Sequence, residues 1–300
     1  MITVFGSINV DFVVRVERHA MLGETILGRS FETTQGGKGA NQALAARRAG
    51  SNVRLVGAVG SDRFADMALE VVRSAGVNLD LVASLDTETG VAVITVSDDG
   101  ENTISVVQGA NGGVSPAMVS RIIDERTQPG DILMLQMEIP ASVNAEAIRV
   151  AKEKGMLVIF NTAPATNAAS ALALSADIVV SNESEFELLV GGPVRSHAQR
   201  VERLKQLHEM TSKTFVVTLG SEGAIAVHKG EMLTVPSLKI QPIDTVGAGD
   251  TFCGYLAAGI DAGQEFYDAL RTAVVAGSVA CLSQGAQPAI PMRSIVAQYM

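Results

Sequence analysis

Tryptophan is absent from this 300-residue sequence, and cysteine occurs only twice, as Cys253 and Cys281. Two cysteines without metal-ligand spacing exclude a disulfide-stapled scaffold and a zinc site, and they favour a reducing compartment. No apolar run approaches the roughly 18 residues that a membrane-spanning helix needs. The segment from Met1 to Gly6 reaches glycine too early for a secretion signal. We therefore expect a cytoplasmic protein with no membrane partner.

Positive charge is also scarce, since 23 Lys and Arg residues stand against 32 Asp and Glu residues, for a formal net charge of −9. Nucleic acids and anionic membranes attract proteins through Lys and Arg, so this balance argues against a nucleic-acid partner. Apolar residues are abundant, at 47% of the chain. That fraction is typical of a globular protein with a large core.

The order of the apolar segments predicts an α/β fold. Short buried strands are expected at residues 2–5, 53–57, 131–136, 157–161, 178–181 and 215–219. Helical patterns follow them, at residues 40–49, 64–74, 115–126, 141–154, 253–260, 266–282 and 292–299. This alternation is typical of a doubly wound, mostly parallel sheet with helices on both faces. No long linker interrupts it, so we expect residues 1–300 to form a single domain.

Two excursions from this pattern predict a small β-sheet lid. Alternating stretches rich in Val, Thr, Ile and Phe occupy residues 12–16, 24–34, 91–97 and 103–108. We expect their strands to come from about residues 10–34 and 89–109 and to form one sheet over a cleft. Such a sheet would leave an apolar face that invites a partner.

The segment Asp244 to Phe252 surrounds a Gly-Ala-Gly turn with two carboxylates and leads into a helix of small residues. A helix start after glycines offers free backbone N–H groups, and its dipole favours anions. Asp250 would repel a phosphate bound there. Its expected use is as a base that takes a proton from a substrate hydroxyl, while N–H groups of Gly247, Ala248 and Gly249 hold the transferred phosphoryl group. The alternative is that Asp250 caps the helix.

A second group of polar residues lies near the amino terminus. Asn9 and Asp11 follow the first strand and alternate with apolar residues, so both could point the same way toward sugar hydroxyls, or form a turn. Next, Gly36-Gly37-Lys38-Gly39-Ala40-Asn41 opens a helix. We expect its glycines to let a ligand approach the backbone, beside a cation and an amide. An ordinary glycine-rich turn is the alternative.

Further candidates follow later strands. Glu138 comes after the strand near residue 135, at the sheet edge where ligands of open α/β folds bind. Asn182 and Glu185 are plausible outer-shell partners of Mg²⁺, and they also fit a capping box at a helix start. Thr218 to Gly223 places two glycines around Ser221 after a core strand, which suits a nucleotide passing over bare backbone.

Taken in order, these segments resemble the ribokinase-like, or PfkB, carbohydrate kinases over the full length of the chain. The resemblance implies transfer of the ATP γ-phosphate to the primary hydroxyl of a pentose, D-ribose above all, with Mg²⁺, in a homodimer joined through the lid. It implies that the sugar binds to Asn9, Asp11, Gly36, Gly37, Lys38, Asn41, Glu138 and Asp250, and that Asp250 is the base. It implies nucleotide binding by Asn182, Glu185, Thr218, Gly220, Ser221, Gly223 and Gly249.

The resemblance also implies a potassium ion as an activator beside the anion pocket. The matching positions are Asp244, Val246, Ala280, Ser283, Gly285 and Ala289. Ala289 stands where this family tends to offer a Ser hydroxyl, so one ion ligand is absent.

Three other functions remain open from the sequence. A kinase of another furanose or of a nucleoside would share the phosphate chemistry, although the polar sugar set favours a small polyhydroxylated ligand. A non-catalytic sugar-binding relative would keep the fold without the base. A NAD-dependent dehydrogenase fits poorly, because Phe252 stands where its fingerprint needs glycine.

Overall fold

Nine strands form the main sheet of the computed structural model, which describes all 300 residues. In spatial order they are β13 (Glu231–Val235), β12 (Ala224–His228), β11 (Thr214–Thr218), β10 (Ile178–Ser181), β9 (Leu157–Asn161), β8 (Ile132–Leu135), β1 (Ile2–Phe5), β4 (Val53–Gly60) and β5 (Asn78–Leu85). Neighbouring strands from β11 to β5 are parallel, and only β12 runs in the opposite direction, antiparallel to both β11 and β13. The sheet is therefore mostly parallel, as predicted.

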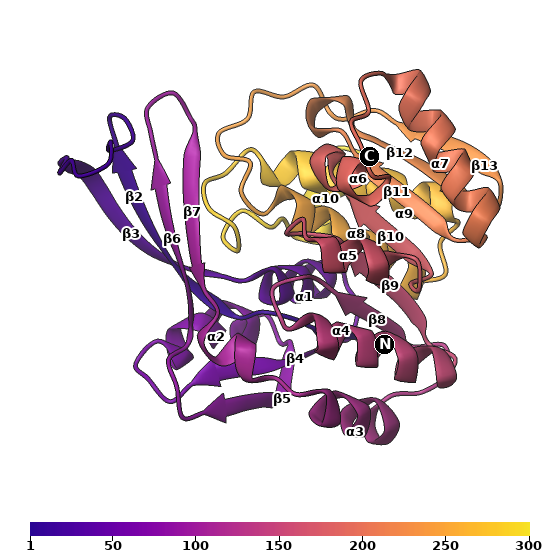
Figure 1. Cartoon of the computed structure of the whole chain (residues 1–300), viewed down its shortest axis with the longest axis horizontal. Coiled ribbons are helices and arrows are strands. Elements are labelled where there is room, and N and C mark those ends of the chain that lie inside the picture. Colours follow the sequence, from indigo (N-terminus) through magenta and orange to yellow (C-terminus); the bar gives the residue numbers. More distant parts are fainter.

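Helices cover both faces of this sheet (Figure 1). They are α1 (Lys38–Arg48), α2 (Ala65–Ser74), α3 (Pro116–Arg126), α4 (Ala141–Glu153), α5 (Asn167–Ala173), α6 (Glu183–Leu189), α7 (His197–Thr211), α8 (Ala248–Asp261), α9 (Phe266–Ala280) and α10 (Arg293–Val296). Side chains of a strand alternate between the faces, so Val4 packs in the core under α1, α8 and α9, and Phe5 in the core under α3 and α4. These two cores confirm the doubly wound prediction. No helix is both long enough and apolar enough to span a bilayer.

The second sheet has four strands in the order β3 (Gly28–Gly36), β2 (Asn9–Val16), β6 (Gly90–Val96) and β7 (Asn102–Val107). It projects from the α/β body at the left of Figure 1, and its strands come from the two expected excursions. We call this sheet the lid. Phe31, Val93 and Val107 are exposed on it. Phe12 stacks on Phe31 and meets Phe64 edge-on, which joins the lid to the start of α2.

Close helix packing fixes the position of α8. At Gly254, an added Cβ would lie 2.4 Å from the Ala45 Cβ and 2.7 Å from the Gln42 carbonyl oxygen of α1. At Gly39, the first turn of α1 meets the backbone of Gly6, just past β1, with only 2.5 Å between an added Cβ and the Gly6 carbonyl carbon. Glycine at these places lets the two helices and the central strand touch backbone to backbone.

Three local predictions were imprecise. Helix α8 begins at Ala248 rather than at residue 253, because Gly247 takes the left-handed conformation (φ 76°) and starts the helix at once. The strand expected at 24–34 runs from 28 to 36. The last helix has four residues instead of eight. Only Val296 is buried in it, so there is too little packing to stabilise a longer helix. Two helices, α5 and the largely polar α7, were not predicted from the sequence.

Candidate active site

The candidate residues converge where the strand order reverses. Strand β1 lies between β4, which follows it in the sequence, and β8, which comes later in the chain. The connections on its two sides therefore run in opposite directions, and a crevice opens at the carboxyl ends of these strands. Asn9 and Asp11 follow β1, Glu138 follows β8, and Asn182 follows β10. Helices α1 and α8 contribute Lys38 and Asp250 to the same edge. Residues that are far apart in the sequence are thus brought together by the parallel sheet.

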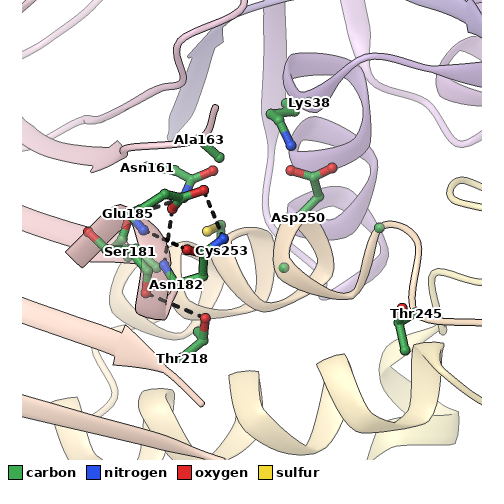
Figure 2. A pocket seen from close by; sticks show the side chains of 13 residues that line it. Lys38, Asn161, Ala163, Ser181, Asn182, Glu185, Thr218, Thr245, Asp250 and Cys253 are labelled. Atoms are coloured by element: carbon green, nitrogen blue, oxygen red, sulfur yellow. Dashed lines mark hydrogen bonds between the residues drawn. The ribbon is translucent and has the colours of Figure 1, made fainter. Parts of the chain in front are cut away.

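A cavity of about 220 Å³ lies between the carboxyl ends of β9, β10 and β11 and the start of α8 (Figure 2). Its lining includes the expected Lys38, Asn182, Glu185, Thr218, Gly247, Gly249 and Asp250, together with Asn161, Ala163, Val180, Ser181, Thr245 and Cys253. The predicted base and part of the predicted nucleotide set therefore share one wall of a polar cavity.

Asp250 does not cap its helix. Neither of its carboxylate oxygens accepts a backbone N–H of α8. Instead, Oδ2 accepts the Asn41 Nδ2 at 2.9 Å and Oδ1 accepts the Gln42 Nε2 at 3.0 Å. The Lys38 side chain points toward the carboxylate (Figure 2). Burial raises the pKa of Asp250, and the charge of Lys38 and the two amide donors oppose this rise. The carboxylate is thus buried and hydrogen-bonded by α1.

The first turn of α8 presents unpaired donors. The backbone N–H groups of Gly249 and Asp250 have no acceptor within the protein, as expected at a helix start. A Cβ added at Gly249 would meet nothing within 4 Å, whereas one at Gly247 would lie 3.0 Å from the Ala286 Cα. Space is therefore left free at Gly249, on the cavity wall. Such a terminus suits an anion.

The charge of Lys38 interacts with three nearby carboxylates, those of Asp11, Glu138 and Asp250. Glu138 Oε2 accepts the Ser7 hydroxyl at 2.5 Å and the Lys38 backbone N–H at 3.0 Å. Asp11 is buried, and its Oδ1 has no partner. Burial, together with the charges of Glu138 and Asp250, raises the pKa of Asp11 to about 7, against the effect of Lys38. Burial also disfavours the Lys38 ammonium, but the surrounding carboxylates outweigh it and raise the pKa of Lys38.

The glycines of the segment before α1 serve the packing of the chain itself. An added Cβ at Gly36 would lie 2.1 Å from the Asp11 Oδ2, and one at Gly37 would lie 2.7 Å from the Ser7 carbonyl oxygen. Gly37 also has a φ of 91°, which disfavours other residues. The Cβ positions at these glycines are therefore filled by protein atoms, and Gly36 makes room for the Asp11 carboxylate.

Asn9 is held by a residue that the sequence analysis did not identify. Asn111 Nδ2 donates to Asn9 Oδ1 at 2.7 Å, and Asn111 also pairs with the backbone N–H and carbonyl of Ile8. Asn111 lies in a glycine-rich 3₁₀ turn, Gly109–Gly113, more than 100 residues away. Its amide fixes the orientation of Asn9 beside Asp11.

The capping-box interpretation of Asn182 and Glu185 is confirmed, and the Mg²⁺ role stays a prediction. The pair forms a capping box at α6, with Asn182 Oδ1 accepting the Glu185 N–H and Glu185 Oε2 accepting the Asn182 N–H. Thr162 Oγ1 donates to the same Glu185 oxygen at 3.0 Å. Both residues also line the cavity. Because protein donors already occupy their oxygens, these residues fit a Mg²⁺ ion held through water better than one bound directly.

The remaining nucleotide candidates lie at one side of this cavity. Thr218 reaches the lining from the end of β11. Gly220 and Ser221 form an exposed 3₁₀ turn outside the cavity, and a Cβ added at Gly220 would meet nothing. Gly223 is crowded, since a Cβ there would lie 2.1 Å from the Val235 carbonyl oxygen. The turn thus offers open backbone at Gly220 but not at Gly223.

A second cavity, of about 450 Å³, separates the lid from the loops around residues 244 and 285. Asp244 joins these loops, because its carboxylate accepts the N–H groups of Val246 at 3.0 Å and Gly285 at 2.9 Å. These three residues of the predicted potassium set are adjacent and line this cavity, and Asp11 lines it from the lid. Ala280, Ser283 and Ala289 line neither cavity.

A buried carboxylate beside a helix start with free N–H groups, in an α/β body that carries a separate β-sheet lid, is typical of a small-molecule kinase. The model of the pfkB family of carbohydrate kinases matches residues 1–293. The protein therefore belongs to the pfkB family of carbohydrate kinases.

Individual relatives agree over the whole chain. A ribokinase of Haemophilus influenzae is 33% identical over 300 residues, covering all of this chain and 98% of that protein. A ribokinase of Lactococcus lactis is 36% identical over 297 residues, covering 98% of this chain and 95% of that protein. The structure of Arabidopsis thaliana ribokinase complexed with ribose and ATP is similar with a TM-score of 0.86 and 32% identity, covering 99% of this chain and 97% of that one.

Proposed function

We propose that this protein is an ATP-dependent kinase that transfers the γ-phosphate of ATP to the primary hydroxyl of D-ribose, giving ribose 5-phosphate. The observation that carries the proposal is the Asp250 carboxylate, buried between Lys38 and two amides at the start of α8, on the wall of the cavity. The similarity to ribokinases supports ribose as the substrate.

Asp250 acts as the general base in this proposal. It accepts the proton of the sugar hydroxyl as the hydroxyl oxygen attacks the γ-phosphorus of ATP and the bond to the β-phosphate oxygen breaks. The free N–H groups of Gly249 and Asp250 stabilise the negative charge of the transferred phosphoryl group, whereas the Ala248 N–H already donates to the Thr245 carbonyl at 3.3 Å. The other sugar hydroxyls bind to Asp11, Glu138 and Lys38, with Asn9, Asn41 and the backbone at Gly36 and Gly37.

The nucleotide lies on the opposite side of the α8 start in this proposal, along Asn182, Glu185, Thr218 and the turn from Gly220 to Gly223. A Mg²⁺ ion bound to the phosphates would neutralise part of their charge. Asn182 and Glu185 fit its outer shell through water, because their oxygens already accept protein donors. We expect Glu185→Gln to raise the Mg²⁺ concentration needed for half-maximal rate, and an unchanged requirement would contradict this role.

The proposed potassium site lies near Asp244. The Asp244 carboxylate accepts the N–H groups of Val246 and Gly285, so three of the six expected positions are adjacent. Because position 289 is alanine, the site lacks a hydroxyl ligand there. The ion would be held by carbonyl oxygens, including that of Ala280, and by Ser283. We expect potassium to raise the rate over lithium at equal ionic strength; equal rates in both salts would remove the site.

A second copy of the chain is the proposed partner of the lid. Phe31, Val93 and Val107 leave apolar surface exposed on this sheet. Burying such surface between two lids would give a homodimer. Sedimentation analysis should give the mass of a dimer for the wild type and of a monomer for Val93→Glu/Val107→Glu. A monomeric wild type would contradict the assignment. A cytoplasmic location fits the two unpaired cysteines.

An ADP-release assay across ribose, 2-deoxyribose, fructose and adenosine tests the substrate. We expect the highest kcat/KM for ribose, because Asp11, Glu138 and Lys38 surround a small polar ligand and no aromatic wall is present for a base. Strong turnover of another compound without turnover of ribose would replace ribose as the substrate. No turnover of any compound would favour a non-catalytic sugar-binding protein.

A further inference from the structure

A chain of three buried amides runs from the main sheet to Asp250. Gln136 follows β8, Gln42 lies in α1, and Asn161 ends β9. Gln136 Nε2 donates to Gln42 Oε1 at 2.7 Å. Gln42 Nε2 in turn donates to the Asp250 Oδ1 at 3.0 Å and to the Asn161 Oδ1 at 3.2 Å. Gln42 and Gln136 are fully buried, so no solvent competes for these bonds.

The three partners of Gln42 determine which way its amide faces. Turning the amide by 180° would place Oε1 against the carboxylate of Asp250 and the oxygen of Asn161. The Asn161 amide cannot turn to compensate, because its Nδ2 donates to the Val180 carbonyl at 3.1 Å. Each lost bond leaves a buried polar atom unsatisfied, which is unfavourable. A donor therefore always faces Asp250.

Glycines keep this chain in register. A Cβ added at Gly6 would lie 2.2 Å from the Gln136 Oε1, and one added at Gly254 would lie 2.7 Å from the Gln42 carbonyl oxygen. Gly254 is one helical turn beyond Asp250 on α8. Because α1 and α8 are in backbone contact there, Gln42 has no freedom to move away from the carboxylate.

Several charged and titratable groups face Asp250 from the elements packed around it. They are Lys38 from α1, Glu138 after β8, Asp11 from β2 and Cys253 from its own helix, with Glu185 acting on Lys38 and Cys253. Burial and Glu138 raise the pKa of Asp250, and Lys38, Asn41 and Gln42 lower it. Gln42 thus provides one of three interactions that favour the ionised carboxylate.

We propose that Gln42 is a positioning residue for phosphoryl transfer: it aims the Asp250 carboxylate at the cavity and supplies a hydrogen bond that the charged form needs. This inference rests on the proposed role of Asp250 as the base. Asn161 acts one step further away: its Nδ2 donates to the Val180 carbonyl at 3.1 Å, so its Oδ1 faces Gln42 and fixes the orientation of the Gln42 amide. Gln42 itself touches neither substrate.

The test is the pH dependence of kcat for Gln42→Met, a change that keeps side-chain length and removes the donor. At saturating ribose and ATP, the acidic limb of kcat reports ionisation of the base in the bound enzyme. Losing a hydrogen bond to a charged group should move this limb up by about one to two pH units. The plateau of kcat should fall about tenfold or more, since the carboxylate is less well aimed. The KM for ribose should stay within about threefold.

Thr127→Val is the matched control. Thr127 is buried, its hydroxyl donates to the Ile123 carbonyl at 2.7 Å, and it lines neither cavity. It should lower the thermal midpoint without moving the limb. A Gln42→Met enzyme with an unmoved limb would overturn the proposal, even if its stability falls.

Gln42→Glu covers the case in which Gln42→Met does not fold. It keeps the shape and accepts from Gln136, but it places a second carboxyl about 3 Å from Asp250. Its limb should move up at least as far, and an unmoved limb would overturn the proposal. A wild-type enzyme without ribose turnover would instead refute the proposed kinase function, so the two failures are distinct.

Discussion

Replacing Asp250 with asparagine separates the chemistry of the carboxylate from its structural role. The Gln42 amide keeps its orientation, because its Nε2 also donates to Asn161, whose own amide is held by the Val180 carbonyl; it therefore keeps donating to the new oxygen at position 250. Asn41 has an unpartnered Oδ1. Turning the Asn41 amide lets this oxygen accept from the new NH₂ group. Both hydrogen bonds of position 250 are thus retained in Asp250→Asn, and the packing of α1 on α8 is preserved.

The effect on kcat should be large. An amide cannot accept the proton of the sugar hydroxyl, and general base catalysis alone contributes about 10² to 10⁴ in rate. This corresponds to roughly 3 to 5 kcal/mol of activation free energy. Sugar affinity should change little, because the other sugar-binding side chains remain. Initial rates from coupled ADP release, with ribose binding measured by calorimetry, give both quantities. A kcat within about tenfold of the wild type, in a folded protein, would refute the role of Asp250 as the base.

Asp250→Asn should lower kcat but should not lower the stability of the folded protein. Burial raises the pKa of Asp250 above its value in the unfolded chain, so the folded state binds this proton more tightly. Stability from this group is therefore full at low pH and declines as the pH rises through the folded-state pKa. Asp250→Asn removes that decline. Its thermal midpoint should equal or exceed the wild-type midpoint, with the larger difference at pH 8 than at pH 5. A lower midpoint at pH 8 would contradict this account.

Three further predictions concern neighbouring residues. In urea denaturation, Gly254→Ala should lower the free energy of unfolding by about 1 to 3 kcal/mol, because the new Cβ would lie 2.4 Å from the Ala45 Cβ. The control Gly192→Ala should change this free energy by less than about 0.5 kcal/mol, because nothing lies within 4 Å of an added Cβ there. Since the pKa of Asp11 is about 7 when folded and 3.8 in its usual state, stability should fall as pH rises from about 4 to 7, and Asp11→Asn should remove that slope in thermal midpoints; a slope that persists would contradict it. Lys38→Met removes the cation among three carboxylates and should raise the ribose KM at least tenfold in steady-state kinetics; an unchanged KM would show that Lys38 does not bind the sugar.

The strand segments and the polar residues at strand ends were predictable from the sequence because both depend on local patterns. Runs such as Leu157–Asn161 and Ile178–Ser181 were predicted with the bounds that the structure has. Polar residues just past a parallel strand must face the crevice, since carboxyl ends of parallel strands share one edge. The capping box at Asn182 is likewise a local pattern. The role of the glycines was less evident. At Gly36 and Gly37 a side chain would clash with other protein atoms, and no spacing in the sequence reveals this.

The sequence by itself determined the fold class and the lid segments and singled out Asp250 as the candidate base, because each depends on composition, periodicity or a short motif. Tertiary structure alone decided the surroundings of Asp250. Gln42, Gln136 and Asn161 meet only because α1, β8 and β9 converge, and Asn111 reaches Asn9 across more than 100 residues. The pKa of a buried acid depends on the donors and charges within a few ångströms, and those neighbours come from segments that no local pattern connects.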